Sequence, residues 1–164
     1  MGKELTNNYL VLKKSKRGYG VFAKNNFKKR ENIIEFTGKL FRGEELPKPY
    51  EKVKDYYVQI DKNLYMGSSK GLDDFFNHSY SPNAGLIINN KKVILIAVNN
   101  IKRNEEITRD YSTTMDEDDF EIKCLCRSKK CRKIIKDFKY LPKNIKNKYI
   151  KLGIVPNYIL EGIK

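Results

Sequence analysis

Two short polar segments contain the residue types from which a binding or catalytic site could be built. Residues 77–83 read Asn-His-Ser-Tyr-Ser-Pro-Asn and hold the one histidine of the chain, and residues 105–111 read Glu-Glu-Ile-Thr-Arg-Asp-Tyr. Apolar residues flank both segments closely, so their polar groups are expected to be partly buried and to need hydrogen-bond partners. A tight turn followed by an ordinary strand explains either segment alone, because short motifs match by chance. It is their occurrence together, in this order, that indicates a functional site.

A third group of residues with chemical potential is a cluster of cysteines. The three cysteines of the chain fall in one segment with the pattern Cys-x-Cys-x4-Cys, at Cys124, Cys126 and Cys131. An odd number of cysteines does not form a secreted disulfide framework. A structural zinc site needs four ligands, usually in a tetrahedral arrangement, and this segment offers three. We therefore expect reduced, partly buried thiols rather than bound zinc, with a partial metal site as the alternative.

The elements that must position these residues are mostly short strands separated by glycine, proline and asparagine turns. Runs of β-branched and aromatic residues predict strands at residues 9–12, 21–23, 32–36, 56–60, 64–66, 86–88 and 93–98. The last two flank the sequence Asn-Asn-Lys-Lys at 89–92, which predicts a hairpin because asparagine tolerates the left-handed conformation. Residues 42–55, with two prolines, predict a loop with a short helix. This pattern is typical of a mainly β fold with short helices.

The C-terminal third has a different character. An acidic run at residues 116–119 precedes the cysteines, and such a run is usually a solvated turn, although it could also attract a basic substrate. Farther on, Pro142 suits the first turn of a helix. Ile145, Tyr149 and Leu152 then share one helical face, and Gly153 is a natural stop. The chain is therefore predicted to end in a helical tail.

Length and charge narrow the class of protein. At 164 residues with 40% hydrophobic content, the chain is long enough for one folded domain with a real core. The net charge of +14 invites a nucleic-acid function, because lysine and arginine release counterions from phosphates. However, the basic residues are mostly scattered lysines rather than clustered arginines, so only weak, nonspecific attraction to nucleic acid is expected. Because no apolar run approaches the roughly 18 residues of a membrane span, we expect no membrane partner and an intracellular, cytoplasmic protein.

Four motifs occur together in an order that a known family shares. They are Gly-Tyr-Gly-Val-Phe-Ala at 18–23, Glu-Phe-Thr-Gly at 35–38, and the polar segments at 77–83 and 105–111. Together they resemble the signature of the SET-domain protein-lysine methyltransferases. The resemblance implies a SET-domain β-clip of small sheets, with a threaded, pseudoknot-like segment and a helical tail. It divides the chain into a catalytic core at 1–112, a post-SET-like segment at 113–133 and a C-terminal tail at 134–164.

The resemblance also implies a cofactor, S-adenosylmethionine. Glycines at 18 and 20 would let the backbone approach a ligand closely, since no Cβ intervenes. By the family's pattern, Asn77 binds the amino-acid end of the cofactor and the backbone of His78 binds its adenine. The expected cofactor-binding residues are Lys16, Arg17, Gly18, Tyr19, Asn77, His78 and Tyr111.

Tyr111 is the expected catalytic residue, in methyl transfer to an exposed lysine of a partner protein. Because an unperturbed lysine has a pKa near 10.4, its reactive neutral form is scarce at pH 7. A narrow apolar channel beside a cationic sulfonium disfavours the ammonium form, and the remaining work is alignment, which a phenol oxygen can assist. The resemblance predicts a substrate channel at Phe36, Tyr57, Leu86 and Arg109.

Three positions depart from the family's pattern. Phe36 stands where relatives often have tyrosine, and Arg109 stands where they commonly have an apolar residue, so the number of methyl groups transferred is open. Tyr80 occupies the position of the family's fourth zinc-binding cysteine, and a phenol is a poor zinc ligand. Without zinc, the tail would have to close the active site by packing, through Ile134, Phe138, Tyr140, Ile145 and Tyr149.

Two other functions stay open at the level of the sequence. One is a catalytically silent SET-fold module that binds lysine or methyl-lysine. The other is a basic chromatin- or nucleoid-associated protein, which would place the chain in the nucleus or nucleoid. Intact Asn77, His78 and Tyr111 favour the enzyme over the silent binder, and the scattered lysines disfavour the nucleic-acid function.

Overall fold

The protein is built from small β-sheets with a helical C-terminal unit. The computed structural model describes residues 5–16, 18–46, 56–118, 121–126, 129 and 131–162. Its strands are β1 (Leu10–Ser15), β2 (Gly18–Ala23), β3 (Asn32–Phe36), β4 (Leu40–Arg42), β5 (Val58–Asp61), β6 (Leu64–Met66), β7 (Asn77–His78), β8 (Ala84–Asn89), β9 (Lys92–Ala97), β10 (Thr108–Arg109), β11 (Ile122–Lys123) and β12 (Ile134–Ile135). Four single-turn helices are η1 (Gly43–Glu45), η3 (Leu72–Phe75), η4 (Tyr111–Thr114) and η5 (Phe138–Tyr140), and the α-helices are α1 (Lys143–Leu152) and α2 (Asn157–Gly162).

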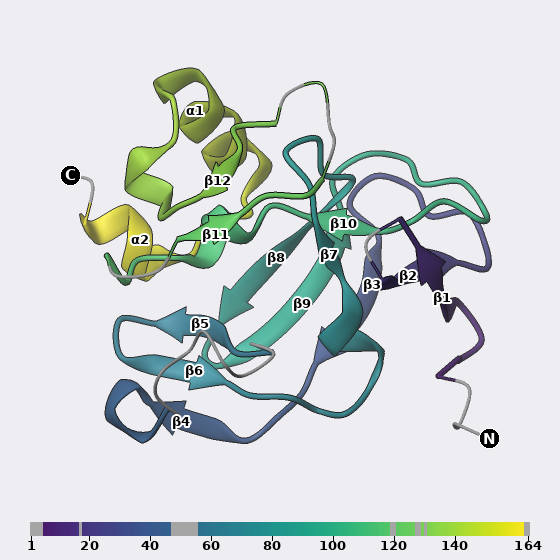
Figure 1. Cartoon of the computed structure of the whole chain (residues 1–164), viewed down its shortest axis with the longest axis horizontal. Helices are drawn as coiled ribbons and strands as arrows, with labels where there is room; N and C mark the ends of the chain where they lie inside the picture. The colour runs from purple at the N-terminus through teal and green to yellow at the C-terminus, as the bar shows by residue number, and fades with distance from the viewer. Residues whose placement is uncertain are drawn as a thin grey trace.

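The central sheet has the strand order β3-β9-β8 (Figure 1). Strands β8 and β9 pair from Ala84 opposite Ala97 to Asn89 opposite Lys92, which leaves Asn90 and Lys91 as a two-residue turn. Both turn residues have positive φ, +47° and +66°. A type I′ turn requires positive φ at both positions, and its twist matches that of the two strands it joins. The predicted hairpin is present, and asparagine at its first turn position is the residue type that tolerates this conformation.

Two further sheets flank the central one. β1 and β2 form an antiparallel pair, and Gly18 enters β2 with φ of +101°, in the region that favours glycine. β4, β6 and β5 form a three-stranded antiparallel sheet. Of the loop predicted at 42–55, residues 43–45 form η1, and residues 47–55 lie outside the described part of the chain.

The segments at 77–83 and 105–111 thread past each other and form a short parallel pair. Strand β7 pairs with β10, Asn77 opposite Thr108 and His78 opposite Arg109, and these strands lie beside β8 in Figure 1. Asn83 fixes the crossing: its Oδ1 accepts from the Thr108 N–H at 2.8 Å, and its Nδ2 donates to the Glu106 carbonyl at 2.9 Å. A two-residue pair is too short to be stable alone, so this side-chain bridge is a necessary part of the structure.

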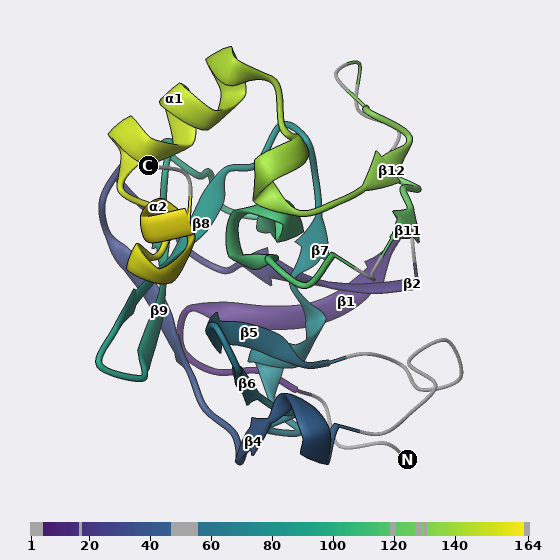
Figure 2. The same ribbon diagram turned by 90° about the vertical axis from the view of Figure 1, so that its left-hand side faces the viewer.

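The tail packs against the outer side of the central sheet (Figure 2). Helix α1 ends at Gly153, which has φ of +70°, and α2 follows after a short turn. Tyr149, Ile154 and Tyr158 are buried in a second core cluster together with Ile96 and Val98. A mainly β fold with short helices, a threaded segment and a helical tail is what the sequence predicted, and the fold is confirmed. No helix in the described part of the chain is long and apolar enough to cross a membrane.

Candidate functional site

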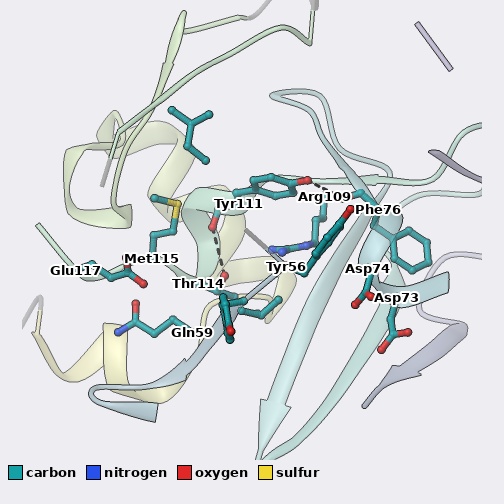
Figure 3. Close-up of a pocket in the computed structure, with 13 residues that line it drawn as sticks. Tyr56, Gln59, Asp73, Asp74, Phe76, Arg109, Tyr111, Thr114, Met115 and Glu117 are labelled. Atoms are coloured by element: carbon teal, nitrogen blue, oxygen red, sulfur yellow. Dashed lines mark hydrogen bonds between the residues drawn. The ribbon is translucent and has the colours of Figure 1, made fainter. Parts of the chain in front are cut away.

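A cavity of about 80 Å³ opens beside the threaded segments (Figure 3). Its wall includes four aromatic residues, Tyr56, Tyr57, Phe76 and Tyr111. The guanidinium of Arg109 and the carboxylates of Asp73, Asp74 and Glu117 also line it. An aromatic cavity with a few convergent polar groups is the usual form of a site that receives a side chain or a small ligand.

Tyr111 is fixed in this cavity by two hydrogen bonds. Its phenol donates to the carbonyl of Phe76 at 2.8 Å, and its backbone N–H donates to Nδ1 of His78 at 3.2 Å. The geometry follows from the fold, because Tyr111 comes two residues after Arg109, the last residue of β10, and the partner strand β7 begins directly after Phe76. The phenol oxygen therefore has a defined position in the wall of the cavity.

Arg109 brings a buried positive charge to the same wall. Its side chain is 8% exposed, and the guanidinium carbon lies 4.4 Å from the centroid of the Tyr111 ring. Such a cation–π contact stabilises the guanidinium where it is poorly hydrated. Arg109 lies opposite His78 in the pair of β7 and β10, and its side chain lines the cavity.

Asp110 lies at the centre of a buried polar network behind Tyr111. Its Oδ2 accepts from Arg132 at 2.9 Å and from the Tyr149 phenol at 2.9 Å, and its Oδ1 accepts from the Ser112 N–H at 3.1 Å. Burial raises the pKa of Asp110, and the Arg132 guanidinium lowers it in part. Burial and the Asp110 carboxylate also raise the pKa of Tyr149. The network joins the cysteine-containing segment and helix α1 to the residue before Tyr111.

The hairpin of β1 and β2 forms a second surface on the other side of β7. Asn77 Nδ2 donates to the carbonyl of Tyr19 at 2.9 Å and to Oε1 of Glu106 at 2.7 Å. Gly20 makes this arrangement fit, because a Cβ there would stand 2.5 Å from Glu106 Oε1 and 2.8 Å from Asn77 Nδ2. An open cavity of about 510 Å³ adjoins, lined by Lys14, Ser15, Lys16, Phe22, Glu106, Leu125 and Cys126.

The structure gathers most of the predicted site residues on these two surfaces. Lys16 lines the larger cavity, Tyr19 receives Asn77, and Tyr57, Arg109 and Tyr111 line the smaller one. Arg17 lies outside the described residues. Phe36 and Leu86 do not line the smaller cavity: Leu86 is 1% exposed in the core, and Phe36 stacks on Phe76, which forms part of the wall.

The cysteine cluster has a neighbour that sequence reasoning missed. A ring nitrogen of His78 and the sulfurs of Cys124 and Cys126 all lie within 4.8 Å of one another. Cys131 packs in the same cluster, and burial raises the pKa of the Cys124 thiol to about 12. Tyr80 at the position of the family's fourth ligand points its phenol elsewhere, donating to the Ile134 carbonyl at 2.6 Å. The sequence had offered only Cys124, Cys126 and Cys131 as ligands, with Tyr80 in place of a fourth, and had not indicated His78.

One residue of the acidic run after Tyr111, Asp118, is paired within the protein. Asp118 pairs with Lys139 and accepts a hydrogen bond from the Tyr140 phenol, and the nearby Glu121 pairs with Lys136. Glu117 lines the smaller cavity, whereas Asp119 lies outside the described residues. At the cavity itself the carboxylates are those of Glu117, Asp73 and Asp74.

Comparison with known families gives a match over the core of the chain. The sequence model of the SET domain matches residues 18–112. A similar curated protein is the variant-silencing SET domain-containing protein of Plasmodium falciparum, 33% identical over 137 residues, which are 74% of this chain and 5% of that protein. Histone-lysine N-methyltransferase set1 of Dictyostelium discoideum is 33% identical over 129 residues, 71% of this chain and 8% of that protein. The chain thus spans a small fraction of these relatives.

Solved structures show the same fold. KRYPTONITE, in complex with mCHG DNA and SAH, superposes with a TM-score of 0.65 at 22% identity, covering 79% of this chain and 29% of that one. A ctPRC2 complex with H3K27me3 and H3K27M gives a TM-score of 0.56 at 24% identity, covering 65% of this chain and 15% of that one. At these identities the likeness concerns the fold.

Proposed function

The chain belongs to the SET-domain family, and on that premise we propose that it transfers a methyl group from S-adenosylmethionine to the side-chain amine of a protein lysine. Several of its relatives are named histone-lysine N-methyltransferases, which supports the reaction class and suggests a basic, histone-like substrate. The structure of KRYPTONITE contains SAH, which supports the cofactor. We also propose residues 1–112 as the catalytic core, 113–133 as a post-SET-like segment and 134–164 as the tail, in an intracellular protein.

The residues around the larger cavity fit the proposed cofactor. When bound, S-adenosylmethionine supplies an electrophilic methyl group on a sulfonium. Both amide protons of Asn77 are used by Tyr19 and Glu106, so Oδ1 is the atom with which Asn77 can receive an ammonium group. The carboxylate of Glu106 adds negative charge beside that position. The absence of a side chain at Gly20 keeps these groups in place, as a Cβ would displace them.

The residues around the smaller cavity fit a lysine side chain. Tyr57, Phe76 and Tyr111 offer aromatic surface to its methylene groups, and the Phe76 carbonyl and Tyr111 phenol offer polar atoms at a fixed position. The carboxylates of Asp73, Asp74 and Glu117 attract a cationic side chain to the cavity. Once inside, the charge of Arg109 disfavours the ammonium form and favours the neutral amine that reacts.

One observation carries the proposal. The two-residue pair of β7 and β10 joins both surfaces, because Asn77 at one end contacts the β1–β2 hairpin and Tyr111 beyond the other end lines the aromatic cavity. A cofactor on the first surface and an amine in the second would be held by the same short element. Holding two reactants in line in this way contributes much of the rate in such displacements.

The test is a labelling experiment with tritiated S-adenosylmethionine, purified core histones and a cell extract. Wild type is expected to label a protein band, and Tyr111→Phe to lower the rate about 100-fold, because the amine loses its orienting oxygen. Tyr9→Phe is the matched control, since Tyr9 is 56% exposed and its phenol lies at the surface. Cofactor binding without any labelling by wild type would refute the proposal and would favour the silent lysine-binding module.

A further inference from the structure

We propose that a basic hollow beside the pair of β1 and β2 binds the phosphate backbone of double-stranded DNA. The hollow has a volume of about 500 Å³, and its lining includes Lys13, Lys24 and Arg103. All three residues are exposed, and no carboxylate lines the hollow among the residues that the structure describes. The two cavities of the proposed reaction differ in this respect, because carboxylates lie beside the cations in both of them. The basic hollow is therefore a separate concentration of positive charge.

The three cations come from segments that are distant in the sequence. Lys13 lies in β1, Lys24 directly follows β2, and Arg103 lies between β9 and β10. Backbone hydrogen bonds fix the two loop positions: the Lys24 N–H donates to the Tyr9 carbonyl at 2.7 Å, and the Arg103 N–H donates to Asn26 Oδ1 at 2.8 Å. The fold thus gathers in one place basic residues that are scattered along the chain.

The glutamates in the adjoining loops are bound by other groups. Glu31 Oε2 accepts a hydrogen bond from the Lys28 N–H at 2.7 Å. Glu105 Oε2 accepts one from the Lys102 N–H at 3.0 Å. Within the described part of the chain, the basic side chains that form ion pairs are Lys62, His78, Lys92, Arg132, Lys136 and Lys139. The charge of the basic hollow is therefore available to an external anion.

The lining favours phosphates over an acidic protein. The centre of a protein interface is apolar and poor in charge, whereas Val11 is the one apolar residue among the described residues of this lining. Phosphate oxygens of nucleic acid are bound by basic side chains together with neutral donors, and the amides of Asn25 and Asn104 are such donors here. The composition of the hollow therefore matches a nucleic-acid backbone.

The lining also favours a duplex over a single strand. No aromatic ring is among the described residues that line the hollow, so an unpaired base would find no surface on which to stack. A duplex keeps its bases stacked inside and presents phosphates at its surface, and its recognition by such contacts carries no sequence information. We therefore expect binding that is independent of DNA sequence and strongly dependent on salt.

The basic hollow adjoins the proposed cofactor site without being part of it. The two share no described lining residue, although Lys13 lines the hollow and Lys14, the next residue of β1, lines the larger cavity. If the substrate is a basic, DNA-bound protein, as the proposed function suggests, DNA in the hollow would hold the enzyme next to it. DNA binding itself does not depend on that function.

The test measures binding to a short, fluorescein-labelled DNA duplex by fluorescence anisotropy over a series of salt concentrations, without S-adenosylmethionine. Each contact between a basic side chain and a phosphate contributes about 0.9 to the slope of log affinity against log salt, or roughly 8-fold in affinity at about 0.1 M salt. The triple variant Lys13→Gln, Lys24→Gln, Arg103→Gln should therefore lower the slope by about 2.7 and the affinity by about 500-fold at that salt concentration.

The matched control is Lys143→Gln, Lys148→Gln, Lys151→Gln, which loses the same net charge. These lysines are exposed on α1, which lies on the other side of the molecule from β1 and β2 in Figure 1. The control should lose less than the roughly 8-fold affinity of a single phosphate contact. Equal losses in the two triple variants would overturn the proposal, because net charge rather than the basic hollow would then determine binding.

Two competitors and a footprint complete the test. Wild type should bind the duplex more tightly than a single strand of the same length or polyglutamate, and the reverse order would overturn the proposal in favour of unpaired bases or an acidic protein. Bound duplex should also protect Lys13 and Lys24 of wild type from acetylation, measured by mass spectrometry, while Lys143 reacts as in the free protein. Unprotected Lys13 and Lys24 would overturn the proposal even if the triple variant does not fold.

Discussion

Replacing Gly20 by alanine tests whether the surface around Asn77 binds the cofactor. The added Cβ would stand 2.5 Å from Glu106 Oε1 and 2.8 Å from Asn77 Nδ2, closer than such atoms can approach. Glu106 is a flexible, partly exposed side chain and can turn toward solvent. The hydrogen bond of 2.7 Å between it and Asn77 would then be lost, although the β1–β2 pairing stays intact.

The magnitude follows from that hydrogen bond. A bond to a charged group contributes about 1.5–3 kcal/mol, and partial exposure puts this one at the lower end, at about 1.5 kcal/mol. Because 1.4 kcal/mol is a factor of ten in affinity, Gly20→Ala should weaken binding of S-adenosylhomocysteine about 10-fold. The free energy of unfolding should fall by a similar amount, about 1.5 kcal/mol, because the same hydrogen bond is lost from the folded protein.

Isothermal titration calorimetry and thermal unfolding separate these two effects. Gly162→Ala is the matched control, since a Cβ at Gly162 would meet no atom within 4 Å. The reasoning is refuted if Gly20→Ala binds S-adenosylhomocysteine as tightly as Gly162→Ala does. It also fails if Gly20→Ala unfolds several kcal/mol more easily, because Glu106 would then not have moved away as argued.

Three further predictions concern the channel and the tail. Arg109→Gln removes a positive charge beside the substrate amine, so the acidic limb of the kcat/KM profile should move to higher pH; an unmoved limb would show that Arg109 does not act on the amine. Gly85→Ala puts a Cβ 2.7 Å from Ile154 Cγ2 and should lower the free energy of unfolding by about 1–3 kcal/mol in a urea titration, and the same change should cost less when it is made in the Ile154→Ala variant. Burial raises the pKa of Tyr158 above its ordinary value. The stability that its buried, neutral phenol provides is therefore fully present below about pH 10, the pKa of an unfolded tyrosine, and is lost progressively as the pH rises above that value. At pH 8 the free energy of unfolding of Tyr158→Phe should therefore be about 1 kcal/mol lower than that of wild type. Between pH 9 and 11 the variant should lose less stability than wild type does, which thermal unfolding at each pH would measure.

The parts of the fold that the sequence predicted are those with local causes. The hairpin at 89–92 follows from asparagine in a turn that needs positive φ, and helix α1 follows from apolar residues spaced along one face and a glycine at its end. The pairing of the segments at 77–83 and 105–111 came from the family resemblance instead. No periodic pattern indicates that two distant, two-residue strands lie parallel.

The parts of the site that the sequence did not predict depend on contacts between distant segments. Asp110, Arg132 and Tyr149 are separated by 22 and 39 residues, and each looks like an ordinary charged or aromatic residue in its own segment. The approach of His78 to Cys124 is of the same kind. The resemblance placed Leu86 in the channel, but in the structure it lies in the buried half of β8 and is part of the core.

The polar network behind Tyr111 explains how so short a parallel pair can hold a site together. Strands β7 and β10 contribute two residues each, and their ladder alone would not persist in water. On one side Asn83 bridges to the backbone at Glu106 and Thr108, and on the other Asp110 binds Arg132 and Tyr149. The tail therefore does more than cover the central sheet, because the phenol of Tyr149 donates to the carboxylate of Asp110, the residue before Tyr111. Removing that hydroxyl leaves the buried Asp110 carboxylate with fewer hydrogen-bond partners next to Tyr111. The free energy with which the tail docks and the position of Tyr111 are therefore coupled.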